Sequence, residues 1–316
     1  MIASEVSVAR VEEGHENAGL AVPALGAGTP LSRWLAAGWR CDAEVRAVEV
    51  EGATVRYRGW GLSEAGKPGL VFVHGFLAHA RWWDHIAPHF ADRYRVIAPD
   101  FTGMGDSDRR AAYSRRQYAR ELVAALRDAG MQDAILVAHS FGTVSALVAA
   151  SIDPERVRRV IVIDAHVFRA EDEGNVPMQP EKSYPSFDAA RARYRLAPPG
   201  AWPDPEIEDY IARHSIRRMA DGRWGWKFDP ETFRSVHRER LRNELKGLPL
   251  AVDFIHAGNS EVVDAASLAA FRLHMPACGT PVTVPLSHHH VMIEQPVGLV
   301  AALNGLLAQP HQGEAR

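Results

Sequence analysis

Residues 45–50 and 53–57 alternate hydrophobic and polar side chains. The two segments are separated by Glu51-Gly52, which predicts an antiparallel hairpin. Further along the chain, short segments rich in apolar residues replace the alternation, as expected for strands that are buried on both faces of a parallel sheet. These segments are residues 70–73, 94–98, 134–138, 157–163, 251–257 and 281–284.

Helical patterns separate these predicted strands. They cover residues 81–91, 113–129, 142–150 and 264–273 and the segment after Pro296. The second of them places Tyr118, Leu122 and Leu126 on one face, and Gly130 ends it. Regular alternation of strands and helices predicts an α/β fold, with a parallel sheet that carries helices on both faces.

Two parts of the chain depart from this rhythm. Residues 1–42 are rich in Ala, Gly and Glu and are predicted to be an N-terminal extension, although the spacing of Leu31, Trp34, Leu35 and Trp39 is helical. Residues 165–246 are rich in proline and contain Arg-rich helical segments. An irregular insertion between 43–164 and 247–310 suggests a lid over the carboxyl edge of the sheet, where open α/β sheets bind ligands.

Composition narrows the class of protein. A chain of 316 residues with 47% hydrophobic content can bury a substantial core, and its net charge of −3 with dispersed Lys and Arg predicts neither a nucleic-acid nor a membrane partner. No apolar run is long enough to span a bilayer, and the acidic first 30 residues do not resemble a secretory signal. Two cysteines, Cys41 and Cys278, cannot form a disulfide framework, so we expect a cytoplasmic protein.

A candidate nucleophile lies between a predicted strand and a predicted helix. Ser140 occupies the turn in Ala138-His139-Ser140-Phe141-Gly142, which is close to the Gly-x-Ser-x-Gly nucleophile elbow. Small residues are needed two positions before and after the serine, because strand and helix nearly touch there. Here Ala138 replaces the first glycine.

Acyl transfer through a serine also needs a base, an acid and donors for an oxyanion. The base candidates are His288, His289 and His290, just after the last predicted strand. Consecutive side chains point in different directions, so at most one of them faces Ser140. A histidine-rich metal site is the alternative, but no Cys or second His cluster has matching spacing, and no metal is expected.

The acid candidate is Glu261, which lies just past the end of another predicted strand. Asp164 ends the strand after the elbow and is its main competitor, and Asp253 and Asp264 are weaker ones. An isolated loop carboxylate is more often simply solvated.

Donors for an oxyanion are predicted in His74-Gly75-Phe76-Leu77, immediately after an apolar strand. Gly75 lets the backbone turn so that the Phe76 N–H points at a substrate oxygen, and the N–H of Phe141 at the start of a helix is the second donor. The glycine-containing segment 100–108 lacks the spacing of a phosphate-binding loop, so it is interpreted as a tight turn and no cofactor is expected.

In order and spacing, these motifs resemble the α/β-hydrolase superfamily over residues 44–308. The resemblance implies a mostly parallel eight-stranded sheet with an inserted helical cap at 165–246. It selects His289 as the base, because the family's catalytic histidine usually precedes a Glu by five residues and a Pro by seven, as Glu294 and Pro296 do here. It places Ser140 as the nucleophile and Glu261 where the family usually has Asp.

The expected function is hydrolysis of a small to medium hydrophobic ester through an acyl-enzyme on Ser140. C–C bond hydrolysis, acyl transfer and lyase or oxygenase chemistry at the same site are alternatives, as is a receptor without turnover. A hydroxyl nucleophile argues against haloalkane dehalogenase and epoxide hydrolase chemistry, because an alkyl ether on serine has no carbonyl at which water can release it.

The insertion is expected to set specificity. Its aromatic residues either line an apolar pocket or hold the insertion together. The candidates for the pocket are Leu77, His139, Trp202, Trp224, Trp226 and Phe228. Four arginines of the insertion are interpreted either as a carboxylate site or as a solvated helix face. They are Arg213, Arg217, Arg218 and Arg223.

Overall fold

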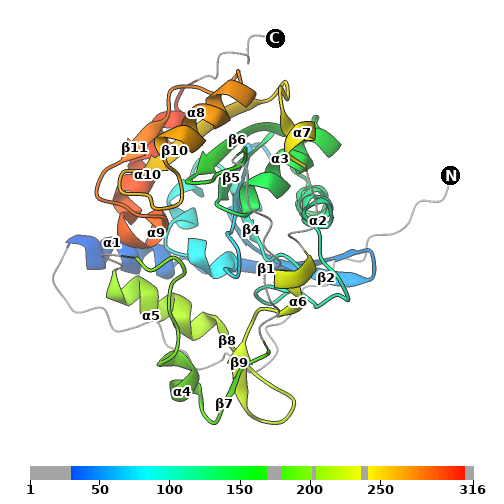
Figure 1. Ribbon diagram of the computed structural model, residues 1–316, viewed down its shortest axis with the longest axis vertical. Coiled ribbons are helices and arrows are strands. Elements are labelled where there is room, and N and C mark those ends of the chain that lie inside the picture. The colour runs from blue at the N-terminus through cyan, green and yellow to red at the C-terminus, as the bar shows by residue number, and fades with distance from the viewer. Residues whose placement is uncertain (1–29, 169–179, 201–203, 236–240, 310–316) are drawn as a thin grey trace.

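A computed structural model of the chain describes residues 30–168, 180–200, 204–235 and 241–309. Its centre is an eight-stranded sheet in the order β1-β2-β4-β3-β5-β6-β10-β11 (Figure 1). The strands are β1 Glu44–Val50, β2 Ala53–Trp60, β3 Gly69–Val73, β4 Arg95–Pro99, β5 Ala134–His139, β6 Val157–Ile163, β10 Ala251–Ala257 and β11 Val282–Val284. β2 is antiparallel to both β1 and β4, and the remaining pairs are parallel. The predicted hairpin and the mostly parallel sheet are therefore confirmed.

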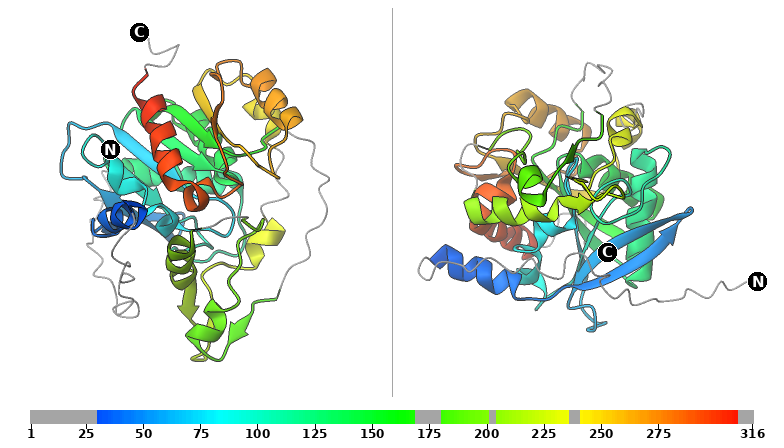
Figure 2. Two further views of the ribbon diagram at one scale, coloured as in Figure 1. Left: turned by 90° about the vertical axis from the view of Figure 1, so that its left-hand side faces the viewer. Right: turned by 90° about the horizontal axis from the view of Figure 1, so that it is seen from below.

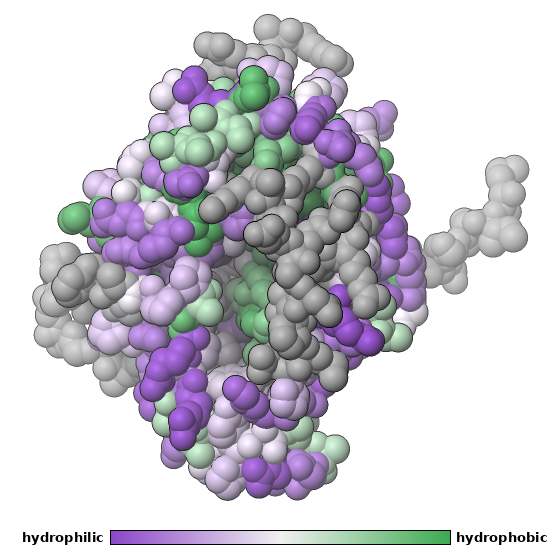
Figure 3. Space-filling view, viewed as in Figure 1, coloured by the Kyte–Doolittle hydropathy of each residue, from purple (hydrophilic) through white to green (hydrophobic). Residues whose placement is uncertain are grey.

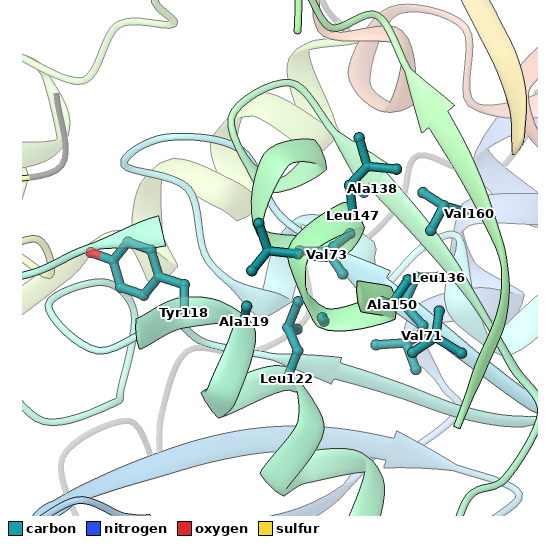
Figure 4. Close-up of a cluster of buried hydrophobic side chains, with 14 of the residues drawn as sticks. Val71, Val73, Tyr118, Ala119, Leu122, Leu136, Ala138, Leu147, Ala150 and Val160 are labelled. Carbon is teal, nitrogen blue, oxygen red and sulfur yellow. The ribbon is translucent and has the colours of Figure 1, made fainter. Parts of the chain in front are cut away.

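Helices cover both faces of this sheet, as predicted. They are α1 Pro30–Trp39, α2 Arg115–Asp128, α3 Gly142–Ile152, α8 Ala265–His274, α9 Val291–Glu294 and α10 Pro296–Leu307. Successive strand residues point to opposite faces. Val71 and Val73 pack with α2 and α3, whereas Leu70 and Phe72 belong to the core cluster of α1 and α10. Figure 4 shows the first cluster, in which Leu122 of α2 lies beside strand and α3 side chains.

The helix predicted over residues 81–91 is replaced by two short 3₁₀ helices, Ala80–Trp83 and Ala87–Phe90. Pro88 explains the break, because proline lacks an N–H and is tolerated only near the start of a helix. Trp83 and Phe90 are still fully buried, so the apolar spacing was informative although one continuous helix does not form.

The helical spacing near the N-terminus corresponds to α1. Leu35 and Trp39 are buried in the core, and the Trp34 ring stacks on His89 with 4.2 Å between ring centroids. The segment from residue 30 to 39 is therefore packed on the body of the protein, while residues 1–29 lie outside the described ranges. None of the helices in the described part is long and apolar enough to cross a membrane.

Most of the insertion between β6 and β10, here called the cap, projects from one end of the core, whereas its last helix, α7 (Arg242–Leu245), lies near α3 and contributes Leu245 to the core (Figures 1 and 2). It contains β7 Ser183–Tyr184, α4 Phe187–Arg191, α5 Pro205–His214, β8 Ile216–Arg218, β9 Trp224–Trp226, α6 Glu231–Ser235 and α7 Arg242–Leu245. Besides the expected helices, the cap contains a three-stranded antiparallel sheet of β7, β9 and β8, which was not predicted. Asp221-Gly222 provides the turn between β8 and β9, with Gly222 at a φ of 79°.

Buried histidines give the fold an expected pH dependence. Burial lowers the pKa of His74, His85, His214 and His290 from 6.5 to about 4. These side chains take up protons in the unfolded chain below pH 6.5 but stay neutral in the folded protein, so stability is full above pH 6.5 and is lost as the pH falls toward 4. We expect the Tm to fall by at least about 5 °C between pH 7 and pH 5. A Tm that is constant between pH 7 and pH 5 would contradict the lowered pKa values of these buried histidines.

Candidate active site

Ser140 lies in a strained turn between β5 and α3. Its φ is 50°, a left-handed conformation that is uncommon for a residue with a side chain. A Cβ atom at Gly142 would lie 2.5 Å from the backbone oxygen of His74, so only glycine fits there. Ala138 is fully buried, and its carbonyl accepts a hydrogen bond from the Thr143 hydroxyl at 3.2 Å. The methyl group that replaces the first elbow glycine is accommodated in the core.

His289 connects Ser140 to a buried carboxylate. Its Nε2 lies 2.8 Å from Oγ of Ser140, and its Nδ1 lies 2.8 Å from Oδ2 of Asp164. A carboxylate only accepts, so we assign the proton to Nδ1, which leaves the Nε2 lone pair facing the serine hydroxyl. The predicted contact between Ser140 and His289 is present in the structure.

The acid beside His289 is Asp164, and the expectation that Glu261 occupies this place is wrong. Asp164 follows β6 at a φ of 45°, and its side chain is inaccessible to solvent. Its Oδ1 accepts the N–H of Ala257 at 3.1 Å, and its Oδ2 also accepts the Ser260 hydroxyl at 2.7 Å. The side chain of Glu261 is 53% exposed and approaches His288, with Oε1 3.7 Å from Nε2.

The loop after β10 explains this difference. The Ser260 hydroxyl accepts the backbone N–H groups of residues 262 and 263, at 3.1 and 2.8 Å, and donates to Asp164. This turn directs Ser260 toward the site and leaves Glu261 outside it. The strand end that was expected to supply the acid instead supplies two donors that hold it. No sequence signal distinguishes Ser260 from other loop serines.

The weaker acid candidates have structural partners. Asp253 forms a buried ion pair with Arg159 at 2.6 Å. Asp264 caps the start of α8 by accepting the Ser267 N–H at 2.8 Å.

The three consecutive histidines have three different partners. His288 contacts the buried carboxylate of Glu294, His289 contacts Ser140 and Asp164, and His290 Nε2 lies 3.0 Å from the Pro198 carbonyl. They therefore do not converge on one point. Within the described ranges, no group of three or more His, Cys, Asp or Glu is arranged to hold a metal ion.

The turn after β3 lies against the nucleophile elbow. A Cβ at Gly75 would lie 3.5 Å from Cβ of Ser140, and the rings of Phe76 and Phe141 are 5.1 Å apart. His74 Nε2 accepts the N–H of Phe101 at 3.1 Å, so its Nδ1 carries the proton and donates to the Gly75 carbonyl at 2.8 Å.

This hydrogen bond orients the peptide between Gly75 and Phe76. In a trans peptide the N–H points opposite to the C=O. With the Gly75 carbonyl held by His74, the Phe76 N–H is directed away from that ring. His74 thus fixes the orientation of the peptide that was predicted to bind an oxyanion.

A cavity of about 380 Å³ opens at Ser140 and His289, between the core and the cap. This size lies within the usual range for small-molecule sites. Many of its lining residues are hydrophobic or aromatic, and they include Phe76, Trp82, Tyr194, Leu196, Phe228 and Phe233. Figure 3 shows hydrophobic side chains near the middle of this face, above the largely polar surface of the cap.

The structure brings some predicted pocket residues to the cavity and not others. Leu77, His139 and Trp226 line it. Trp224 is not among the lining residues and packs edge-on against Phe187, with ring centroids 5.3 Å apart. Trp202 lies outside the described residues.

The cations at the cavity are not the four predicted arginines. Arg213 pairs with Asp209, Arg217 pairs with Glu181, Arg223 bonds Ser183, and Arg218 is exposed. The lining cations are Lys182, Arg193, Arg195 and Lys227. Sequence reasoning missed them, because no local pattern distinguishes these cations from the other Lys and Arg residues of the cap.

The model of the alpha/beta hydrolase family matches residues 70–303. Esterase Rv0045c from Mycobacterium tuberculosis is 26% identical over 273 residues, which cover 82% of this chain and 88% of that protein. Epoxide hydrolase A from the same organism is 33% identical over 156 residues, 47% of this chain and 44% of that protein.

Coverage of the curated relatives is uneven. The chain spans 44% of Epoxide hydrolase A and 63% of Lipase LipV, which is less than two thirds of each. Among solved structures, the crystal structure of E-2-(acetamidomethylene)succinate hydrolase superposes with a TM-score of 0.71 at 24% identity. That match covers 84% of this chain and all of the other chain, and it supports the fold.

Proposed function

The chain belongs to the alpha/beta hydrolase family and is a hydrolase, and on that premise we propose that it cleaves small to medium hydrophobic carboxylic esters through an acyl-enzyme on Ser140. The hydrogen-bonded series from Ser140 through His289 to Asp164, at the wall of an aromatic cavity, is the observation that carries this proposal.

In the proposed reaction, Ser140 Oγ attacks the ester carbonyl carbon while its proton passes to Nε2 of His289. Asp164 stabilises the imidazolium that forms and holds the ring in the required tautomer. The N–H groups of Phe76 and Phe141 stabilise the oxyanion. The bond from the acyl carbon to the alcohol oxygen then breaks as His289 gives its proton to the leaving alcohol. In the second half of the reaction His289 takes a proton from a water that attacks the acyl carbon, and it returns this proton to Ser140 as the acid leaves.

The residue at the elbow separates this proposal from the chemistry that the name of one relative indicates. An epoxide opened by Ser140 would leave an alkyl ether, and water has no carbonyl at which to hydrolyse that ether. An ester acylates Ser140, and the acyl-enzyme keeps a carbonyl that water attacks.

Pre-steady-state kinetics test the proposal. With p-nitrophenyl esters of two to eight acyl carbons, we expect a burst of p-nitrophenolate close to one equivalent per enzyme, followed by slower turnover. The apolar cavity predicts faster reaction of the medium chains than of acetate. Absence of p-nitrophenolate release with every ester, in a folded protein, would reject the acyl-enzyme and favour a lyase, an oxygenase or a receptor.

A further inference from the structure

A buried lysine of the cap, Lys227, is one of the residues that line the cavity at Ser140, and its ammonium group lies behind the cavity surface. Lys227 follows β9, and its side chain is only 7% exposed. Its backbone N–H donates to the Ser215 carbonyl at 2.8 Å, which fixes its position beside the end of α5. Its Nζ lies 2.5 Å from Oδ1 of Asp106, a residue of the loop that follows β4.

This ion pair does not use all the donors of the ammonium group. Nζ is inaccessible to solvent and makes no well-aligned hydrogen bond to the residues that the structure describes. An ammonium has three N–H donors, so donors remain beyond the contact with Asp106. The Asp106 side chain is 42% exposed, and solvent screens its charge more than that of the buried ammonium.

The rest of the cavity wall has the same sign of charge. Lys182, Arg193 and Arg195, which are exposed to solvent, line it at its cap side, and none of the described lining residues is Asp or Glu. Burial, and then the charge of Lys227, lower the pKa of His79, which also lines the cavity. Walls of low dielectric with one sign of charge concentrate the field inside a cleft. The described cavity wall is therefore largely apolar, with cationic side chains and no carboxylate among its lining residues.

We propose that Lys227 binds an anionic oxygen group of the substrate, so that the preferred esters carry a carboxylate beyond the scissile carbonyl. This inference rests on the proposed esterase function and narrows its substrate class. Lys227 is a specificity residue, because its contact lies on the part of the substrate that does not react.

The competing interpretation is that Lys227 and Asp106 only tie the cap to the core. The two interpretations predict different effects of substitutions at these two residues on the preference for an anionic ester. As a tie, either substitution weakens the same contact and affects all esters alike. As an anion site, loss of the ammonium lowers the preference for an anionic ester, whereas loss of the Asp106 charge frees the ammonium and raises that preference.

Two acyl groups of nearly equal shape measure this preference. p-Nitrophenyl hemiglutarate is negative at pH 7, and p-nitrophenyl 5-oxohexanoate is its neutral counterpart. We expect the ratio of kcat/KM, anionic over neutral, to be about 10 to 100 in the wild type, the size of a charge-assisted hydrogen bond. Raising the salt concentration is expected to lower this ratio.

The variants then separate the interpretations. Lys227→Met is expected to bring the ratio close to one, Lys227→Arg to keep it well above one, and Asp106→Asn to raise it above the wild-type value. Arg218→Met is the matched control, because it removes one exposed cap cation that does not line the cavity. The proposal would be overturned if Lys227→Met left the ratio unchanged. It would also be overturned if Lys227→Met and Asp106→Asn shifted the ratio in the same direction.

Binding measurements keep this inference distinct from the proposed function. If the wild type hydrolyses neither ester, the esterase proposal fails, and calorimetry with glutarate alone still tests Lys227. Glutarate is expected to bind the wild type at least about tenfold more tightly than Lys227→Met. Inorganic phosphate serves as the second probe. Stronger binding of phosphate than of glutarate would overturn the carboxylate assignment.

Discussion

Replacing Asp164 by Asn is expected to lower kcat for ester hydrolysis by about 10³- to 10⁴-fold. The amide keeps the shape of the carboxylate, and its oxygen can still accept the Ala257 N–H. Its NH₂ group would then face Nδ1 of His289, so that the ring carries its proton on Nε2. A histidine in that tautomer cannot accept the Ser140 proton. Steady-state kinetics with a p-nitrophenyl ester measure the loss.

Glu261→Gln is the matched comparison, because it makes the same chemical change at the other candidate acid. Its side chain is half-exposed, and within the described part of the chain its recorded partner is His288. We therefore expect kcat to change by less than about threefold. Both variants should unfold within a few degrees of the wild type. A large loss with Glu261→Gln and little loss with Asp164→Asn would reverse the assignment of the acid.

Ser140→Ala is expected to lower kcat by about 10⁴- to 10⁶-fold, the largest effect of any single substitution. The substitution removes one oxygen atom and with it the only group in the proposal that bonds to the acyl carbon. The residual rate would come from binding and oxyanion stabilisation alone. Chromogenic ester hydrolysis at high enzyme concentration reaches the required sensitivity.

Two controls show whether the loss of activity in Ser140→Ala comes from the missing hydroxyl or from misfolding. The Tm of Ser140→Ala should stay close to that of the wild type, because the hydroxyl is not part of the core. The variant Ser140→Cys should recover a burst of p-nitrophenolate, since a thiol placed at the same elbow is also a nucleophile. Activity within tenfold of the wild type in Ser140→Ala would exclude an acyl-enzyme at this residue.

Most of the core was predictable, because a strand that is buried on both faces appears in the sequence as a short run of apolar residues. β3, β5 and β6 are short and rich in apolar residues, and each of them lies inside the sheet. The cap was harder to predict, because β7, β8 and β9 have only two or three residues each, too few to show a period. One helix was predicted over residues 81–91, but a single proline, Pro88, divides this segment into two 3₁₀ helices.

The nucleophile and the base were predictable because short sequence motifs identify them. The acid was not predictable, because no such motif identifies it. Ser140 needs a turn with small neighbours, and that requirement is visible within five residues. The position of a carboxylate relative to His289 depends on how two separate strand ends, those of β6 and β10, turn at the sheet edge. The hydroxyl of Ser260 decides that turn through its hydrogen bonds to backbone groups and to Asp164.

Charge in the cavity was not predictable from the density of arginines in the cap. Arg213 and Arg217 are paired with carboxylates on the cap, whereas Lys227 lines the cavity together with Trp226 and Phe228. Which cation faces a ligand depends on the pairing of β8 with β9, which tertiary structure determines.

Mass spectrometry of the protein after treatment with a fluorophosphonate tests the central claim most directly. The account predicts one added phosphonyl group per chain, located by peptide mapping on Ser140, and loss of this labelling in both Ser140→Ala and Asp164→Asn at matched times. Labelling at another residue, or none in a folded wild-type protein that hydrolyses esters, would contradict it.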